Sequence, residues 1–489
     1  MKPAAAEFDT TRTLRQRYAW WSALPETRYE LAVPADSRAA LAAGWLMLGL
    51  ASLIGSGIFS ILLVASRTPY FQNVFPLVDF FHVALVVHVD LSVLVWFLAL
   101  GGVFWSINST GRFVAVGWVA LALAAAGTAI LCVAPFSGRG AAIMSNYVPV
   151  LDDALFLTGL LVFMAGFVLL VLRSLATAPR VGVRIDGAGA LRFGLNTAAV
   201  AAAMAVIALV WSWLTVPHGL PARGYYDILF WGAGHVVQFT YTLLMLVAWL
   251  WLATTCGARM PLTPRVTVLL FGVGLASVFV APIIYLAWGV TSVEYRKLFT
   301  WVMQFGGGLA IVPLGLAVMW GLMRGVAVGA SARPLRAALV CSMALFAIGG
   351  IIGFLIEGSN VKIPAHYHGS IVGVTLALMG AVYLLLPRLG YREPAPRLAT
   401  LQPYLYASGQ LLHVIGLVWS GGYGVQRKVA GAAQVLRSTE EIVAMGVMGL
   451  GGLVAVAGGL LFLVIVVQAM WHGPAAPRGD MGGGGSSVG

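Results

Sequence analysis

His366 and His368 are separated by a single tyrosine and stand at the start of a long apolar run, from about residue 369 to 386. Neutral imidazole is a common metal ligand. Because an α-helix turns about 100° per residue, rings two positions apart project from nearly opposite sides. One helix could therefore give an axial ligand to each of two metal centres. The alternative is a pair of hydrogen-bonded histidines at the end of a membrane helix, since polar rings in hydrocarbon need partners.

Two further histidines lie inside apolar runs, His88 in 83–107 and His235 in 227–255. A histidine one or more turns inside a membrane helix is a functional candidate. If successive helices alternate in direction, these two runs and the run headed by His366 all begin on the same side of the membrane. Four imidazoles are therefore predicted at a similar depth.

The other histidines carry weaker signals. His82 is nearer the interface, His218 lies in a predicted outer loop and His472 in the C-terminal tail, so we expect all three to be solvated. His413 lies in the middle of an apolar run without a partner pattern, and a hydrogen-bonded core histidine is the favoured interpretation.

The composition indicates an integral membrane protein. Of the 489 residues, 60% are hydrophobic and only 9% are charged, whereas soluble domains are about a quarter charged. We predict an all-α, polytopic fold with about 12 transmembrane helices of about 20 residues each. The predicted spans are 40–65, 83–107, 113–135, 154–173, 193–216, 227–255, 266–289, 299–323, 335–357, 366–387, 402–421 and 441–471.

The basic residues predict the topology. Most of the 29 Lys and Arg residues fall in the N-terminal segment and in alternate loops, and such residues concentrate on the cytoplasmic side. We therefore expect a cytoplasmic N-terminal segment (1–39), a membrane domain (40–471) in contact with lipid, and a disordered cytoplasmic tail (472–489). Topology accounts for the net charge of +12, so no nucleic-acid partner is expected.

The three cysteines, Cys132, Cys256 and Cys341, are far apart in the sequence. No thiol pair has the spacing of a dinuclear copper site or a c-type heme attachment. A copper or heme that receives electrons from outside would therefore belong to another subunit.

A histidine in the second span, the Trp231-Gly-x-Gly-His235 element in the sixth and His366-x-His368 in the tenth together carry a family resemblance. In this order, within twelve helices, they resemble subunit I of the heme-copper oxidase and nitric oxide reductase superfamily, over roughly residues 40 to 470. The resemblance implies a bundle in the bacterial inner (plasma) membrane, with further membrane subunits and a periplasmic electron donor of the cytochrome c or cupredoxin type.

The resemblance also implies roles for single residues. His88 and His368 match the two axial ligands of a low-spin heme, His366 the proximal ligand of a high-spin heme, and His235 a ligand of the distal copper. Both hemes are expected to be b-type. Iron held by two imidazoles shuttles electrons, whereas iron held by one keeps a face open for a diatomic gas.

Arg427 and Lys428, in the loop after the eleventh span, match a basic pair that the family places against heme propionates. Charge-assisted hydrogen bonds there would be strong. An ordinary solvated pair is the alternative.

The sequence departs from the family at the copper. The seventh span, around 281–288, has no adjacent histidine pair, and Phe239 stands one turn after His235, where the family has Tyr or Glu. One imidazole does not hold copper tightly, since copper sites normally use three or more N or S donors. Copper is therefore doubtful, and the alternatives are no copper, copper held by unusual ligands such as Tyr285, and copper completed by another chain. Tyr285 is the candidate to act with His235 in catalysis, and Tyr241 is the other tyrosine that could replace the family's residue.

Three functions remain open. The first is a respiratory oxidoreductase that passes electrons through two hemes to O2 or NO. The second is a non-pumping electron-transfer or gas-binding heme subunit that has lost the dinuclear chemistry. The scarcity of intramembrane ionisable groups argues against a proton pump. The third, a twelve-helix transporter without heme, leaves the four histidines at one depth unexplained.

Overall fold

The computed structural model describes residues 27–68, 78–182, 185–429, 435–471 and 473. Residues 1–26 of the predicted N-terminal segment, and all of the predicted tail except Gly473, lie outside the described residues.

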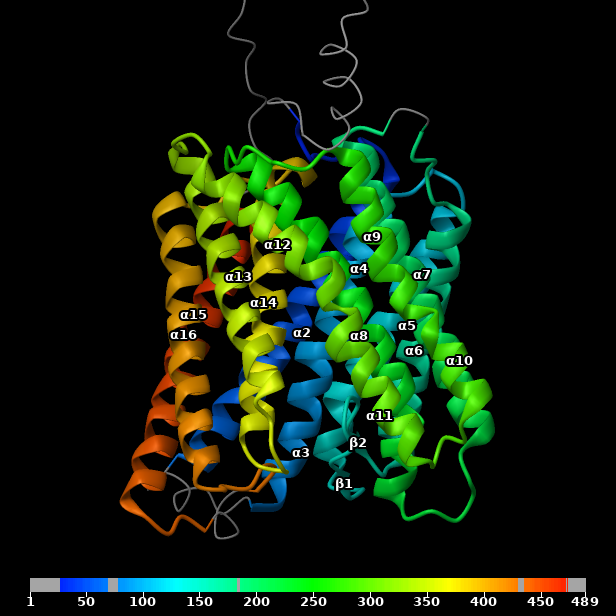
Figure 1. The fold of residues 1–489 in the computed structure, drawn as a ribbon, viewed down its shortest axis with the longest axis vertical. Coiled ribbons are helices and arrows are strands. Elements are labelled where there is room, and N and C mark those ends of the chain that lie inside the picture. The colour runs from blue at the N-terminus through cyan, green and yellow to red at the C-terminus, as the bar shows by residue number, and fades with distance from the viewer. Residues whose placement is uncertain (1–26, 69–77, 183–184, 430–434, 472, 474–489) are drawn as a thin grey trace, which may run out of the picture.

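The described chain is a bundle of long, roughly parallel helices (Figure 1). The long elements are α2 (Ser37–Arg67), α3 (Val78–Val89), α4 (Trp96–Ile107), α5 (Val114–Val133), α6 (Ala154–Ala176), α7 (Gly187–Thr215), α8 (Ala222–Thr255), α9 (Pro264–Val278), α10 (Val280–Ala287), α11 (Val293–Trp301), α12 (Gly308–Met323), α13 (Arg333–Phe354), α14 (Lys362–Leu385), α15 (Pro396–Gly422) and α16 (Thr439–Trp471). The short elements are the π-helical turns η2 (Asp90–Val95) and η4 (Val302–Gly306), the 3-10 turns η3 (Ala134–Ser137), η5 (Ala330–Ala332) and η6 (Pro387–Leu389), and strands β1 (Ala142–Ile143) and β2 (Val150–Leu151). The predicted all-α fold is confirmed.

Eleven helical stretches of the described chain are long and apolar enough to cross a membrane. The predicted span 402–421 is not one of these, although it forms the 27-residue helix α15. Polar side chains lower its hydropathy, and they are satisfied within the bundle: Gln402 is fully buried, accepts a hydrogen bond from Tyr383 and donates one to Gly458 O. α15 packs along α16 over most of its length.

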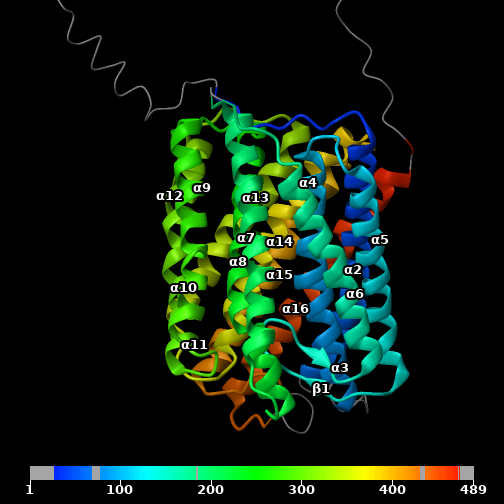
Figure 2. The same cartoon turned by 90° about the vertical axis from the view of Figure 1, so that its right-hand side faces the viewer.

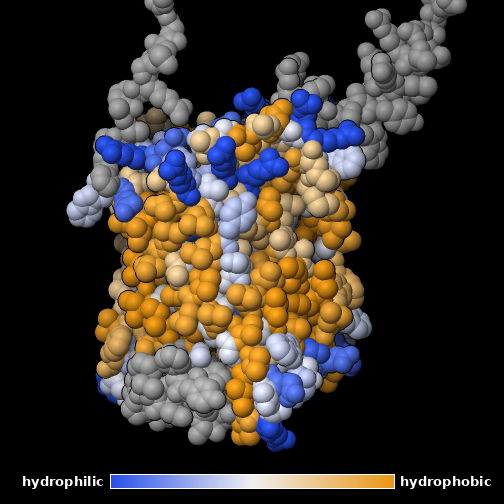
Figure 3. Space-filling model, turned by 90° about the vertical axis from the view of Figure 1, so that its left-hand side faces the viewer, coloured by the Kyte–Doolittle hydropathy of each residue, from blue (hydrophilic) through white to orange (hydrophobic). Residues whose placement is uncertain are grey.

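An apolar belt surrounds the bundle. Figure 3 shows hydrophobic side chains between two ends that carry the hydrophilic ones. Large apolar side chains of the membrane-length stretches are highly exposed, such as Leu286 at 77% and Leu161 at 71%. A soluble monomer rarely exposes so large an apolar area, so the chain is a multi-pass membrane protein. The start of α2 and the end of α16 lie at one end of the bundle, here named the terminal end (Figure 1).

α8 and α14 form the centre of the bundle and contact each other. In their most apolar stretches 89% and 83% of residues are buried, whereas the share in the other spans is 33% to 61%. These two helices carry His235, His366 and His368. Three of the four candidate ligands are therefore on the two most buried helices, and the fourth, His88, is on α3.

A small hairpin covers the other end of the bundle, near α3 (Figure 2). Its antiparallel strands β1 and β2 pair Ala142 with Leu151 and Ile143 with Val150. The loop between them spans 144–149 and includes Tyr147, whose φ of +63° lies in the left-handed region. We name the segment 142–151 the hairpin, and this end of the bundle the hairpin end.

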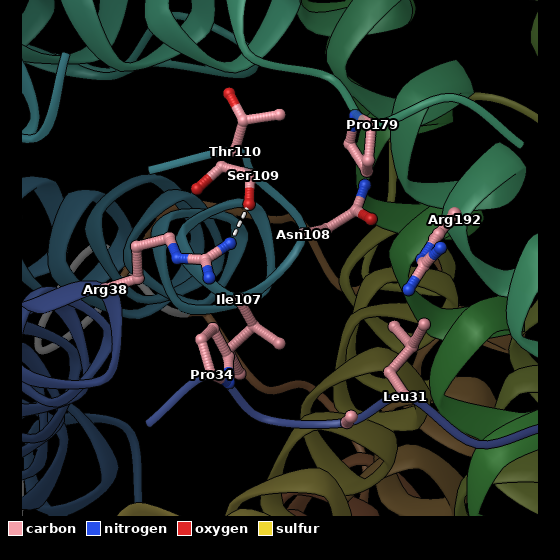
Figure 4. Close-up of a pocket in the computed structure, with 10 residues that line it drawn as sticks. Leu31, Pro34, Arg38, Ile107, Asn108, Ser109, Thr110, Pro179 and Arg192 are labelled. Carbon is pink, nitrogen blue, oxygen red and sulfur yellow. Dashed lines mark hydrogen bonds between the residues drawn. The ribbon is translucent and has the colours of Figure 1, made fainter. Parts of the chain in front are cut away.

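A hollow of about 340 Å³ opens at the terminal end, between the start of α2 and the ends of α4 and α6 (Figure 4). Arg38, Asn108 and Arg192 contribute its polar lining. The Arg38 guanidinium is already bound to the Asp36 carboxylate and to Ser109 O. This hollow is lined by none of the four candidate ligands, His88, His235, His366 and His368.

Glycines allow α15 and α16 to pack closely. A Cβ on Gly416 would lie 2.4 Å from Met448 N, and one on Gly409 would lie 2.3 Å from Ala455 N. Small residues at helix contacts are the usual means of close packing in membranes.

We expect Gly416→Ala to lower the thermal unfolding midpoint in detergent, because the added methyl meets backbone and overpacking costs about 1–3 kcal/mol. Gly446→Ala, in α16, is the matched control, since its Cβ meets nothing within 4 Å. Equal midpoints for the two variants would contradict the close contact.

Candidate metal centres

His366 and His368 diverge from one helix, as their spacing predicts. His366 Nδ1 lies 2.7 Å from Gly349 O, on α13, and His368 Nδ1 lies 3.2 Å from Gln410 Oε1, on α15. Gly353 gives His366 room, because a Cβ there would lie 2.8 Å from Nδ1. The two rings therefore face different sides of α14.

His88 lies near the end of α3 and faces α2. Its Nδ1 is 3.1 Å from Ser56 O and 3.0 Å from Ser56 Oγ. The π-helical turn η2 follows almost directly, and such turns are frequent at functional sites. Asp90, the first residue of η2, is 1% exposed, and neither of its carboxyl oxygens has a hydrogen-bond partner among the described residues.

The candidate ligands share one hydrogen-bonding pattern, in which Nδ1 approaches a carbonyl oxygen. For His235 the acceptor is Trp231 O, at 2.7 Å. A neutral imidazole that donates from Nδ1 keeps its lone pair on Nε2, which is how metal-bound histidines are usually oriented. Within the described chain nothing hydrogen-bonds Nε2 of His88 or His366, so these donors fit an axial ligand of iron.

His413 is the expected hydrogen-bonded core histidine, since its Nδ1 lies 2.9 Å from Met448 O. It also packs against His368, with ring centroids 4.4 Å apart. This contact was not predicted, because α14 and α15 carry no shared periodic signal at these positions. His413 therefore helps to fix the ring of a candidate ligand.

His235 differs from the other candidates because its Nε2 has a partner. The hydroxyl of Tyr147, in the hairpin loop, lies 2.8 Å away. Burial raises the pKa of Tyr147 well above its usual value, so the phenol stays protonated and donates. The rings of Tyr147, Trp231 and Phe299 surround the imidazole at centroid distances of 4.7, 4.8 and 5.9 Å.

Tyr285, the predicted catalytic partner of His235, uses its hydroxyl elsewhere. The hydroxyl lies 2.7 Å from Ser212 Oγ, 2.9 Å from Ala208 O and 3.1 Å from Tyr295 Oη. The tyrosine that is hydrogen-bonded to His235 is Tyr147 instead, and it was not predicted from the sequence. The sequence gives no periodic signal that connects the two, since 88 residues separate them.

The surroundings of His235 do not fit copper. Among the described residues no three side chains of His, Cys, Asp or Glu come together to hold a metal ion. The one nitrogen that could bind is already hydrogen-bonded to Tyr147. Copper requires more donors than this site offers.

Arg427 and Lys428 are half-buried and hold the hairpin loop. Lys428 Nζ donates to Met144 O at 2.6 Å, and Arg427 Nη2 donates to Asn146 Oδ1 at 3.3 Å. Burial, and next the charge of Arg427, lower the pKa of Lys428 to about 8. His82, which was expected to be solvated, lies with Nε2 3.2 Å from Lys428 O. The pair is thus part of a structured end and not an ordinary solvated loop.

Comparison with known proteins gives consistent results. The sequence model of the family "Cytochrome C and Quinol oxidase polypeptide I" matches residues 40–455. An uncharacterized protein of Rickettsia prowazekii (strain Madrid E) is 28% identical, over 88% of this chain and 96% of its own length. An uncharacterized protein of Aquifex aeolicus (strain VF5) is 26% identical, over 74% of this chain and 88% of its own length.

Among solved structures, a heme-copper terminal oxidase, determined as a dimer by cryo-electron microscopy, is similar with a TM-score of 0.67 and 15% identity. The match covers 89% of this chain and 84% of the oxidase chain, and it supports the fold. The family match spans most of the membrane domain and includes all four candidate ligands. The chain therefore belongs to the cytochrome c and quinol oxidase polypeptide I family, the heme-bearing catalytic subunits of membrane oxidoreductases.

Proposed function

We propose that this chain carries a low-spin heme between His88 and His368 and a high-spin heme on His366. The observation that carries the proposal is the orientation of the imidazoles: Nδ1 of each is hydrogen-bonded to a protein oxygen, and His366 and His368 bond to different neighbours of the central helix α14, namely α13 and α15. Such hemes supply one-electron transfer at the iron with two imidazoles and a gas-binding face at the iron with one.

The residues around the ligands have positioning roles. Ser56, Gly349 and Gln410 each accept a hydrogen bond from Nδ1 of one ligand and thereby fix the ring's tautomer and direction. Such partners typically raise metal affinity 10- to 100-fold. Arg427 and Lys428 provide positive charge at the hairpin end, where it can neutralise heme propionates.

The proposed reaction passes electrons from a periplasmic cytochrome c or cupredoxin-like donor to O2 or NO at the high-spin heme. The hairpin end would face the periplasm of a bacterium and both termini the cytoplasm, in agreement with the distribution of Lys and Arg. The second candidate is a non-pumping electron-transfer or gas-binding subunit without terminal turnover. The hydroxyl of Tyr147 at Nε2 of His235 favours this candidate, since no distal metal is then available.

One experiment separates these functions: metal analysis of the purified chain, together with its reduced-minus-oxidised spectrum and its rate of O2 and NO consumption. Two irons per chain with turnover support the oxidoreductase. Two irons without turnover support the second candidate, and a chain without heme refutes both.

We expect His88→Ala and His368→Ala each to abolish the sharp absorption band of reduced six-coordinate heme, because either change removes one axial ligand. A CO-reactive heme should remain. His218→Ala, at an exposed loop position, is the control and should leave both signals. Survival of the low-spin band in either variant would show that the assignment is wrong.

For His366→Ala we expect the opposite of the result for His88→Ala and His368→Ala. Loss of the single proximal imidazole should remove CO binding to the reduced protein, while the low-spin spectrum is retained. The measurement is the CO difference spectrum, normalised to protein. If the wild-type protein binds no CO, the high-spin site does not exist.

We expect a heme midpoint potential that falls between pH 7 and pH 9. Lys428, with a pKa of about 8, is positively charged below that pH and neutral above it, and a positive charge favours the reduced heme. A unit charge roughly 10 Å away at an effective dielectric constant of about 20 changes a one-electron potential by on the order of 70 mV. Lys428→Met should flatten this dependence, whereas Lys297→Met, at an exposed position of α11, should not.

A further inference from the structure

We infer that the phenol of Tyr147 occupies the position beside His235 Nε2 that a distal metal would take. The distal group is then a hydrogen-bonded Tyr147–His235 pair and not a metal. Only the role of the pair, which is to present a polar group to a gas bound at the heme, rests on the proposed high-spin heme. The pair itself is a feature of α8 and the hairpin. Tyr147 is a positioning residue, because it acts through His235.

The direction of the hydrogen bonds supports the pair. His235 Nδ1 lies 2.7 Å from Trp231 O, which can only accept, so Nδ1 carries the proton. Nε2 must then accept from the Tyr147 hydroxyl at 2.8 Å. A metal at Nε2 would need the same lone pair. Tyr147 and a metal therefore exclude each other at this nitrogen.

Gly234 provides the space for the phenol ring. A Cβ at this position would lie 2.2 Å from Tyr147 Cγ, and the three nearest atoms to it all belong to Tyr147. Glycine inside a helix is unfavourable relative to alanine. The glycine that precedes His235 thus has a specific steric role in admitting this one side chain.

The hairpin loop is held so that Tyr147 keeps its position. Tyr147 has a φ of +63°, which is rare for a bulky residue and persists when surrounding contacts impose it. Those contacts are the hydrogen bond from Asn146 N to Asp227 Oδ1 at 2.8 Å and the bond from Lys428 Nζ to Met144 O. The residue just before the tyrosine, Asn146, and the first residue of the loop, Met144, are therefore tied to the bundle.

Aromatic rings pack on both members of the pair. Trp231 and Phe299 pack on the imidazole, and Trp231 also packs edge-on against Tyr147 at 5.9 Å. In such an apolar surrounding, a hydrogen bond is stronger than in water. The Tyr147–His235 bond is thus expected to persist in solution.

The first test needs no heme. The difference between the ultraviolet resonance Raman spectra of wild type and Tyr147→Phe isolates the ring modes of Tyr147. We expect the tyrosine ring-mode doublet to have the intensity ratio of a phenol that donates a strong hydrogen bond. The doublet should change when both proteins also carry His235→Ala. A doublet typical of a free phenol, or one insensitive to His235, overturns the inference.

The second test uses the heme-loaded protein and CO. Tyr147→Phe and Gly234→Ala should change the CO dissociation rate in the same direction, by roughly two- to tenfold, because both remove the phenol from His235 Nε2 and change the polar surroundings of the bound CO by about the energy of one hydrogen bond. Tyr226→Phe and Gly224→Ala, both in α8, are the matched controls, since a Cβ on Gly224 meets nothing within 4 Å. An unchanged rate in both test variants refutes the role of the pair.

The third test is a titration with Cu(I), followed by removal of loosely bound ions. The wild-type chain should retain no stoichiometric copper. One copper per chain that is lost in His235→Ala overturns the inference. If wild type binds no CO, the proposed high-spin heme fails, whereas the Raman and copper results still decide the Tyr147–His235 pair.

Discussion

A polar ring in the interior of a membrane bundle must be hydrogen-bonded, and this constraint determines how each imidazole is held. Nδ1 of each candidate ligand donates a hydrogen bond to a protein oxygen. The acceptors are the carbonyl oxygens of Ser56, Gly349 and Trp231 and the amide oxygen of Gln410. The same bonds that make burial tolerable also place the proton on Nδ1 and leave the lone pair on Nε2. Stability and ligand presentation therefore come from one set of contacts.

Whether Nε2 has a protein partner distinguishes the sites. His88 and His366 have none among the described residues, and they are proposed as iron ligands. His235 has Tyr147, brought from a distant hairpin and accommodated by Gly234. The bundle is thus shared with the heme-copper oxidases, while one residue in a loop changes which chemistry the distal side can support.

The sequence is sufficient to predict the helical bundle and the divergence of His366 and His368, because hydropathy and helical geometry are local properties. It is also sufficient to show that the seventh span lacks a histidine pair. It does not reveal Tyr147, because that contact depends on a left-handed residue in a six-residue loop and on partners from α8 and the α15–α16 loop. Tyr285 was expected at the site because of its place in the sequence, but Ser212 and Tyr295 engage its hydroxyl.

The hydrogen bonds that hold the hairpin loop also have a consequence for biogenesis. Met144 and Lys428 are separated by 284 residues, so their hydrogen bond cannot form until the chain up to the α15–α16 loop has left the ribosome. During synthesis the hairpin is therefore held only by contacts to nearby helices such as α3 and α8. The surroundings of His235 are among the last parts of the molecule to become fixed, after the central helices have already been inserted.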